Sequence, residues 1–367
     1  MAVYIHQRKD WAHFTWQNDT IATLLADVRY NQGRLMGKME NLGFNLQAEA
    51  TLETLTLDVL KSSEIEGELL NSDQVRSSIA RRLGMDIAGL IPADRNVEGV
   101  VEMMLDATQN FILPLSDERL FGWHAAMFPT GRSGMNKIVV GNWRDNTTDD
   151  PMQVVSGPSG REIVHFQAPD AALLNNEMNA FFNWFNSNKE LDPVIKAAIS
   201  HLWFVTIHPF DDGNGRIARA ITDLQLARAD YSKQRFYSMS AQIRKERKAY
   251  YDMLESTQKD GLDITEWLTW FFNCLNRAIN ASEETLAVVR RKATFWVKHQ
   301  MDLNNRQSLL LNKLLDGFEG KLTSSKWAKI LKCSSDTAIR DINDLMQKNI
   351  LTKEPGGGRS TSYILAE

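Results

Sequence analysis

One polar, glycine-rich segment, His208 to Arg219, constrains this chain more than any other feature of its sequence. It reads His-Pro-Phe-Asp-Asp-Gly-Asn-Gly-Arg-Ile-Ala-Arg and lies between two stretches with apolar residues at helical spacing. Glycines just before a helix let backbone N–H groups converge on an anion, and the helix N-terminus adds a partial positive charge. The segment therefore predicts an anion-binding loop between two packed helices.

The side chains of this loop suit phosphate chemistry. Arg216 and Arg219 are three residues apart on one helix face, where both guanidinium groups can bind phosphate oxygens. Asp212 offers an oxygen ligand for a Mg2+ ion that bridges such phosphates. His208 has the one type of side chain that ordinarily titrates near neutrality, so it is the candidate general base. Each residue alone also fits an ordinary glycine turn with a core histidine and surface arginines, but the joint pattern H-x-F-x-D-G-N-G-R-x-x-R favours the phosphate site.

This loop resembles the motif of the Fic/Doc family of protein adenylyltransferases at every defining position. The resemblance implies transfer of AMP from ATP and Mg2+ to a Ser, Thr or Tyr hydroxyl of a target protein. It makes His208 the catalytic base, Asp212 the metal ligand and Phe210 the anchor of the loop. The implied ATP ligands are Gly213, Asn214, Gly215, Arg216, Arg219, Tyr250, Tyr251 and Gln258. For the two tyrosines, a place in the core is the alternative.

A hairpin is the clearest strand signal ahead of the loop. Met152 to Val155 and Glu162 to Phe166 flank a turn that reads Ser-Gly-Pro-Ser-Gly. Fic relatives place a flap hairpin over the active site, which aligns the target segment by strand addition. The resemblance therefore assigns target binding to Ile163, Val164, His165 and Phe166. An ordinary exposed hairpin is the alternative.

A second short motif lies near the end of a helix predicted over residues 46–70. Ser62-Ser63-Glu64-Ile65-Glu66-Gly67 matches the inhibitory pattern [S/T]-x-x-x-E-[G/N] of the family. The resemblance implies that Glu66, with Ser62, pairs with Arg219 and keeps the γ-phosphate of ATP from binding productively. A solvent-facing glutamate is the alternative, and Glu66 could also position a water that removes AMP again. Glu68 departs from the asparagine that many relatives carry at this place.

Helical spacing dominates the rest of the chain, so we predict an all-α fold apart from the flap hairpin and a C-terminal wing. Asn71 predicts a helix cap, and Asp192-Pro193 predicts a helix start. Three domains are expected: a helical domain with the inhibitory helix over 1–90, a Fic core over 91–300 and a winged helix over 301–367. In the last, 335–348 would be the recognition helix and 351–365 the wing.

The charge of the tail leaves its partner open. Residues 321–367 carry eight Lys or Arg and five Asp or Glu, a local charge of 8 − 5 = +3. This mildly basic balance is compatible with DNA binding and with a protein contact such as a homodimer.

Two rival functions remain open for the whole chain. One is a DNA-binding regulator whose core senses nucleotide, and the other is a transferase of another phosphate-linked group. Glycine at position 215 favours AMP over the latter, because phosphotransferase relatives carry a bulkier residue there.

Composition narrows the classes further. The formal net charge of -4 argues against a chain that coats nucleic acid or anionic membrane along its whole length. The start of the sequence has no apolar signal region, and no stretch approaches the ~18 apolar residues that a membrane span needs. The two cysteines, Cys274 and Cys333, are too far apart for a zinc knuckle or a disulfide scaffold. We therefore expect a cytoplasmic protein without a membrane partner.

Overall fold

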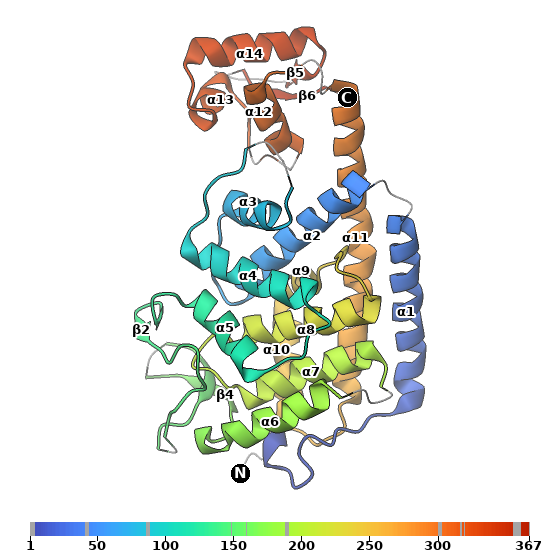
Figure 1. The fold of residues 1–367 in the computed structure, drawn as a ribbon, viewed down its shortest axis with the longest axis vertical. Helices are drawn as coiled ribbons and strands as arrows, with labels where there is room; N and C mark the ends of the chain where they lie inside the picture. Colours follow the sequence, from blue (N-terminus) through green and yellow to red (C-terminus); the bar gives the residue numbers. More distant parts are fainter. Residues whose placement is uncertain are drawn as a thin grey trace. The chain divides into compact units, whose positions relative to one another are not determined.

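The computed structural model describes residues 4–40, 44–85, 89–147, 149–158, 160–187, 191–299, 303–315, 318, 320–354 and 361–366. As predicted, the fold is mainly helical (Figure 1), and the strands within these residues form three separate two-stranded antiparallel sheets. Within the same residues, no helix is both long and apolar enough to span a membrane. By compactness the chain forms two units, Met1–Met85 with Leu90–Thr285, and Asp86–Gly89 with Leu286–Glu367. The three domains predicted from the motifs are defined by content rather than by compactness, so they do not correspond to these two units. That division stays a prediction.

The first unit contains most of the helices. They are α1 (Asn18–Glu40), α2 (Phe44–Ile65), α3 (Ser72–Arg82), α4 (Arg95–Gln109), α5 (Asp117–Met127), α6 (Leu174–Phe185), α7 (Pro193–Ile207), α8 (Asn214–Asp230), α9 (Met239–Lys245), α10 (Arg247–Gln258) and α11 (Thr265–His299), which continues into the second unit, together with the 3-10 turns η1 (Ile5–Gln7) and η2 (Ala171–Leu173). The strands are β1 (Arg132–Ser133), β2 (Asn136–Lys137), β3 (Gln153–Ser156) and β4 (Ile163–Gln167). The hairpin β1–β2 was not predicted, since two-residue strands leave no alternating pattern to detect.

The pair α7 and α8 forms the centre of this unit and carries the glycine-rich loop between them. Every residue of α7 from Val194 to Ile207 is buried, which explains why its sequence is apolar on all sides. As predicted, α7 starts at Asp192-Pro193: the Asp192 carboxylate accepts a hydrogen bond of 2.7 Å from the backbone N–H of Val194. Burial of both helices gives the loop two rigid supports.

The end of α2 differs from the prediction. The helix stops at Ile65 rather than near residue 70, because Gly67 adopts a left-handed φ of +85°. The backbone N–H of Glu68 then donates to the carbonyl of Ser63 at 3.0 Å, the closing bond of a glycine-terminated helix. Glu66 and Glu68 consequently lie in a turn beyond the helix instead of on its surface.

A buried polar cluster fixes α2 to its neighbours. The carboxylate of Asp58 on α2 accepts hydrogen bonds from the hydroxyl of Ser238 and, at 3.3 Å, from the backbone N–H of Ser240. Nearby, Arg235 donates to the Asp223 carboxylate of α8 at 2.8 Å, and both side chains are almost fully buried. Burial and the adjacent Asp58 carboxylate raise the pKa of Asp223 well above its usual value. Such a buried, hydrogen-bonded cluster resists displacement of α2 along α8.

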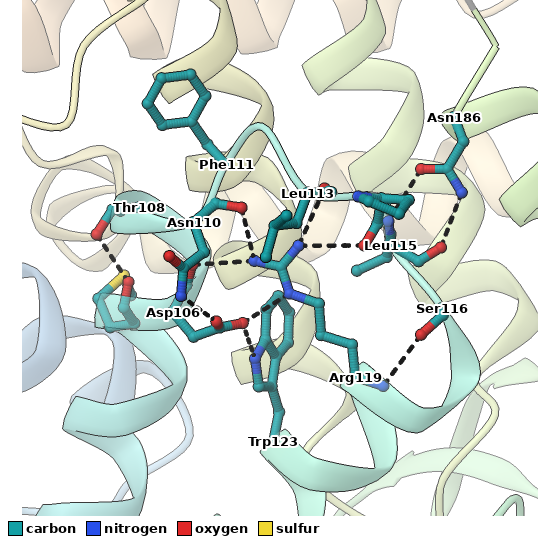
Figure 2. Close-up of polar contacts among 12 residues, drawn as sticks. Asp106, Thr108, Asn110, Phe111, Leu113, Leu115, Ser116, Arg119, Trp123 and Asn186 are labelled. Atoms are coloured by element: carbon teal, nitrogen blue, oxygen red, sulfur yellow. Dashed lines mark hydrogen bonds and ion pairs between the residues drawn. The ribbon is translucent and has the colours of Figure 1, made fainter.

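Figure 2 shows how the connection between α4 and α5 is held. Arg119 and Trp123 of α5 both donate to the carboxylate of Asp106 on α4, at 2.6 and 2.8 Å. Further along, the amide of Asn186 exchanges two hydrogen bonds with the backbone of Leu115, at 2.8 and 2.9 Å. These contacts fix α5, whose His124 supports the glycine-rich loop described below.

The second unit is small and has its own core. Its elements are α12 (Asn305–Leu315), α13 (Ser324–Ile330), α14 (Ser335–Gln347), β5 (Leu351–Lys353) and β6 (Tyr363–Leu365). Trp327, Leu310 and Ile342 are buried at its centre. Residues 355–360 of the expected wing lie outside the described residues. The winged helix therefore stays a prediction, and so does its partner.

Candidate active site

The glycine-rich loop is anchored by its own aromatic residue. Phe210 is fully buried and stacks on His124, with ring centroids 4.3 Å apart. Asn214, the first residue of α8, donates from its amide to the carbonyl of Phe210 at 2.7 Å and accepts from the Phe210 backbone N–H at 3.0 Å. Phe210 thus lies where the family resemblance places it. The side chain of Asn214 thus closes the loop, and its backbone N–H is one of the groups at the start of a helix that have no partner within that helix.

Arg144 holds the start of the loop, and sequence reasoning missed it. His208 has a left-handed backbone, with φ +51°, which is costly for a residue other than glycine. Arg144 is buried and donates from Nε to the His208 carbonyl at 2.8 Å and from its backbone N–H to the Pro209 carbonyl at 3.0 Å. These bonds fix the turn that brings the imidazole to the rim of the loop.

The hydrogen bonding of His208 leaves one ring nitrogen free as a base. Nδ1 lies 3.2 Å from the carbonyl oxygen of Val205, which can only accept, so this nitrogen carries the hydrogen and Nε2 keeps its lone pair. Burial lowers the pKa of His208 to about 4, and the positive charge of Arg144 acts in the same direction. At neutral pH the ring is therefore uncharged and able to accept a proton.

Two arginines lie in the first two turns of α8. The side chains of Arg216 and Arg219 are 7% and 2% exposed, and Phe128 lies against the Arg216 guanidinium, 5.1 Å from its carbon to the ring centroid. Within the described residues, Nε of Arg216 and Nη1 of Arg219 are buried and have no hydrogen-bond partner. Unpaired buried N–H groups of a cation are costly, and an anion at the nearby helix N-terminus would satisfy them.

Both arginines are paired with carboxylates from the turn that follows α2. Glu66 accepts from Nη2 of Arg219 at 2.8 Å, and the hydroxyl and carbonyl oxygens of Ser62 accept from the same guanidinium at 2.9 Å each. Glu68 accepts from Nη1 of Arg216 at 2.5 Å. Burial disfavours the charge of Arg219, but the Glu66 carboxylate and the nearby hydroxyl groups of Tyr250 and Tyr251 act in the opposite direction, and together they raise the pKa of this arginine.

The Glu66 carboxylate also covers Gly215. A Cβ atom built on this glycine would lie 2.2 Å from Oε1 of Glu66, closer than two non-bonded atoms can approach. Glycine at this position therefore leaves room for a carboxylate over the first turn of α8. The space that Glu66 occupies is next to the backbone N–H groups that would otherwise meet an anion.

Asp212 is the candidate metal ligand. Its carboxylate accepts hydrogen bonds from the Ser133 hydroxyl and, at 2.6 Å, from the backbone N–H of Gly213. The described residues contain no group of three or more His, Cys, Asp or Glu side chains that could hold a metal ion by themselves. Magnesium is commonly bound by one or two carboxylates, with substrate phosphates and water completing its shell. Asp212, at the end of the loop that leads into α8, fits that pattern.

The residues expected around the adenine divide into two groups. Tyr251 lies at the loop, with its hydroxyl 3.4 Å from Oε2 of Glu66. Tyr250 is buried, and its hydroxyl lies 2.8 Å from Nε2 of His201 in α7. Gln258 is buried as well and donates to the hydroxyl of Thr206 at 3.1 Å. Tyr251 thus contacts Glu66, and both tyrosines lie close enough to Arg219 to influence its pKa. Tyr250 and Gln258 also have polar partners in α7.

The flap hairpin presents a mixed surface. Ile163 and Val164 are exposed, at 63% and 39%, although both are apolar. Phe166 is buried instead, with its ring 5.2 Å from that of Tyr4. His165 contacts Glu255 on α10 at 2.6 Å. Of the four residues expected to meet a target, two are therefore exposed, one anchors the hairpin and one links it to a helix.

Similarity to known proteins agrees with this arrangement. A family model described as Fic/DOC family matches residues 114–226, which include the whole loop and both arginines. Residues 114–226 are a Fic/DOC family domain. A second model, described as a domain of unknown function (DUF4172), matches residues 4–85, which include Ser62 and Glu66.

Relatives and solved structures extend the similarity beyond the Fic domain. "Protein adenylyltransferase Fic" from Drosophila yakuba is 28% identical over 233 residues, which cover 60% of this chain and 40% of that protein. The protein of the same name from Drosophila melanogaster is 27% identical, with 60% and 41% covered. The chain thus spans about two fifths of the length of these curated relatives.

Two crystal structures share the fold. A Fic family protein from Desulfovibrio desulfuricans has a TM-score of 0.50 at 21% identity, covering 96% of this chain and 97% of its own. A Fic domain containing signaling protein from Bacteroides thetaiotaomicron has a TM-score of 0.51 at 19% identity, covering 73% of this chain and 97% of its own. At these identities the similarity shows the fold alone.

In the Fic domain we expect His208 to stay uncharged as the pH falls through 6.5. Burial holds its folded-state pKa at about 4, below the unfolded value of about 6.5. Its contribution to stability is therefore present above pH 6.5 and is lost as the pH falls towards 4, because the unfolded chain binds the proton more readily. NMR titration of histidine-labelled protein, with His208→Gln for assignment, measures this. Protonation of His208 near pH 6.5 would contradict it.

Sequence reasoning missed several residues that shape the Fic domain's loop. Besides Arg144, they are His124, which stacks on Phe210, and Ser133, which donates to Asp212. Each lies far from the loop in sequence and in an unremarkable context, so no spacing connects it to the motif. Glu68 was noted only as a departure from the relatives, and its position two residues after Glu66 is the signal that could have suggested a second carboxylate at the site.

Proposed function

We propose that this chain transfers AMP from ATP to a Ser, Thr or Tyr hydroxyl of a target protein, and that Glu66 restrains the reaction. The observation that carries the proposal is the pair of buried arginines, Arg216 and Arg219, at the start of α8, each with an unpaired N–H group. Anionic phosphates suit both groups, since arginine binds phosphate oxygens through paired N–H donors. The similarity of the Fic domain to proteins named protein adenylyltransferase supports the choice of AMP.

The residues of the loop have distinct roles in this proposal. The target hydroxyl oxygen attacks the α-phosphorus of ATP, its proton moves to Nε2 of His208, and the bond from the α-phosphorus to pyrophosphate breaks. The backbone N–H groups of residues 213–215 stabilise the charge on the α-phosphate, and Arg216 and Arg219 hold the outer phosphates. Mg2+ held by Asp212 would add charge neutralisation on the phosphates when bound. The protein thus contributes positioning and electrostatics rather than a covalent intermediate.

The carboxylates of the turn after α2 oppose nucleotide binding in this proposal. Glu66 engages Arg219 and covers Gly215, and Glu68 engages Arg216, so a γ-phosphate must displace at least one negative charge. Both contacts are with largely buried guanidiniums, where charges are only weakly screened. Glu66 could also position a water for removal of AMP from the product, a second role that the same experiment can follow.

The test uses ATP labelled at the α- or at the γ-phosphate, with Mg2+ and cell lysate as the source of acceptors. We expect α-label on lysate proteins and no transfer of γ-label. Mass spectrometry should locate the modification on hydroxyl side chains. Transfer of γ-label alone would replace AMP transfer by phosphotransfer. Release of α-label from purified product on dilution into Mg2+ buffer would support the second role of Glu66, in the removal of AMP.

The DNA-binding alternative is not favoured by α14. This helix carries three aspartates, Asp336, Asp341 and Asp344, and one arginine, Arg340. A recognition helix that meets phosphates usually carries an excess of basic residues. We therefore propose a protein contact, such as a homodimer, over DNA as the role of the second unit.

A further inference from the structure

A cavity between α2, α9 and α11 has no role in the proposed function. Its volume is about 450 Å3, and pockets that hold small molecules usually measure roughly 300–1,000 Å3. All of its lining lies in the first compact unit. We call it the α2–α9 cavity, and the side chains that matter most here are Thr54, Leu57 and Lys61 of α2, Arg244 and Lys245 of α9, and Ala281 of α11.

Small side chains keep this cavity open. Ala278, Ala281 and Ser282 of α11 all line it, and their spacing of three and four residues puts them on one helix face. Leucine and phenylalanine side chains fill the space around α11 elsewhere, as Phe272 and Leu275 do in the core. Alanine and serine fill much less space, so room for a ligand remains beside α2.

The cavity is positively charged. Among the described residues that line it are three cations, Lys61, Arg244 and Lys245, and no Asp or Glu. One carboxylate lies beside them, since Glu64 pairs with Lys61 at 2.6 Å and with Arg244 at 3.4 Å. The charge of these four side chains is 3 − 1 = +2. A pocket lined by charges of one sign attracts small ions of the opposite sign, so the ligand that fits is an anion.

The remaining lining suits the body of an organic molecule. Leu57, Phe236 and Ala278 supply apolar surface, and Thr54 and Ser282 add two hydroxyl groups. Apolar walls with a few polar groups are the usual composition of a small-molecule site. For the anionic part, arginine binds phosphate oxygens through paired N–H donors, and lysine adds a compact charge. The combination favours a phosphate attached to an apolar body.

The cavity and the glycine-rich loop lie on different faces of α2. Lys61 lines the cavity, whereas the next residue, Ser62, accepts a hydrogen bond from Arg219. Consecutive residues of a helix point in different directions. None of the described residues that line the cavity belongs to the loop or forms a hydrogen bond with Arg216 or Arg219. A ligand in the cavity would therefore leave the loop arginines accessible.

We propose that the α2–α9 cavity is a second small-molecule site of this chain and that its ligand is an organic phosphate. The phosphate contacts Arg244 together with Lys61 and Lys245, and the apolar body lies against Leu57 and Phe236. This assignment does not depend on AMP transfer, since it uses neither the loop nor its histidine.

The first experiment treats the full chain with pyridoxal 5′-phosphate, an aromatic phosphate. Its aldehyde carbon bonds to a lysine nitrogen, water leaves, and borohydride reduces the imine to an amine that peptide mass spectrometry locates. We expect Lys61 or Lys245 to be labelled about tenfold faster than Lys248, because one charge-assisted contact changes affinity by about that factor. The side chain of Lys248 is 89% exposed and that of Lys61 33%, so exposure alone predicts the opposite order.

Pyridoxal, which lacks the phosphate, is the matched control probe and should label the cavity lysines no faster than Lys248. Labelling of Lys61 and Lys245 no faster than that of Lys248 by pyridoxal 5′-phosphate would overturn the proposal. The same preference with pyridoxal would overturn it as well, because the phosphate would then not be recognised.

The second experiment measures binding of pyridoxine 5′-phosphate, which has no aldehyde, by calorimetry. Arg244→Gln should weaken binding by about tenfold, and Ala281→Phe, which fills the cavity, should weaken it at least as much. Lys248→Gln removes an exposed charge outside the cavity and Arg216→Gln a charge at the loop, and both should bind like the wild type. Binding lost in Arg216→Gln but retained in Arg244→Gln and Ala281→Phe, or no measurable binding to the wild type, would overturn the proposal. Thermal melting of each variant verifies that it is folded.

Discussion

Replacing Glu66 by glycine should raise AMP transfer to lysate proteins by roughly tenfold or more. In the wild type, Arg219 is 2% exposed and is held by Glu66 at 2.8 Å, so each productively bound ATP must break this pair. Charge-assisted hydrogen bonds of this kind contribute about 1.5–3 kcal/mol, and about 1.4 kcal/mol corresponds to a tenfold change in occupancy. Because Glu66 lies in a turn after α2 rather than inside the helix, glycine should cost little helix stability.

Two further variants sharpen this expectation. Glu66→Gly combined with Glu68→Gln frees both guanidinium groups and should transfer faster than either single variant, because Glu68 still engages Arg216 in the first. Glu64→Gln is the matched control: its carboxylate pairs with Lys61 and Arg244, away from the loop, and its transfer should equal that of the wild type. Rates are measured with α-labelled ATP at subsaturating concentration. Equal labelling by the wild type and Glu66→Gly would contradict the inhibitory role of Glu66.

Replacing His208 by alanine should abolish transfer to other proteins while ATP binding stays within a few-fold of the wild type. The phosphates are expected to bind the arginines and the backbone of α8, whereas Nε2 of His208 acts only on the attacking hydroxyl. Loss of a general base lowers rates by about 10^2–10^4. Transfer is followed with α-labelled ATP in the Glu66→Gly background, and affinity by calorimetry with Mg2+ and ATP.

The comparison of the two measurements decides the role of His208. A variant that binds ATP normally and transfers nothing to lysate proteins fits a base. His208→Ala that still transfers at the wild-type rate would assign the proton to another group. A melting temperature close to that of the wild type excludes collapse of the loop, which Phe210 and Arg144 hold independently of the imidazole.

Local signals in the sequence predicted much of the fold because they depend on neighbouring residues. The side chain of Asn71 accepts from the N–H of Gln74 at 3.0 Å and starts α3 as expected from the cap. The glycine-rich motif predicted a helix that begins just after it, and α8 begins at Asn214, so Arg216 and Arg219 lie on one helix face. The roles of His208 and both arginines stay predictions. The contact of Glu66 with Arg219 is likewise present as an ion pair, although its effect on activity awaits the experiment above.

Contacts between distant segments were not predictable in the same way. The stacking of His124 on Phe210 depends on how α5 packs, and the position of Arg144 on how the chain returns from the hairpin. Nothing in the spacing of these residues records either. Even the end of α2 was placed too late, because the apolar pattern continues past Gly67 while the left-handed backbone of that glycine ends the helix. Tertiary packing, not local propensity, decided these cases.

The buried cluster around Asp58 bears on how Glu66 would release Arg219 in the proposed inhibition. Asp58 lies one helical turn before Ser62, so the anchor of α2 is next to the groups that hold Arg219. Sliding the helix away would expose that anchor, whereas rotating a partly exposed Glu66 side chain leaves it in place. Rotamer changes of this type take picoseconds to nanoseconds, far less than helix displacements. ATP and the Glu66 carboxylate would then compete for Arg219 at equilibrium. The rate of AMP transfer would follow the cellular ATP concentration without a delay from helix movement.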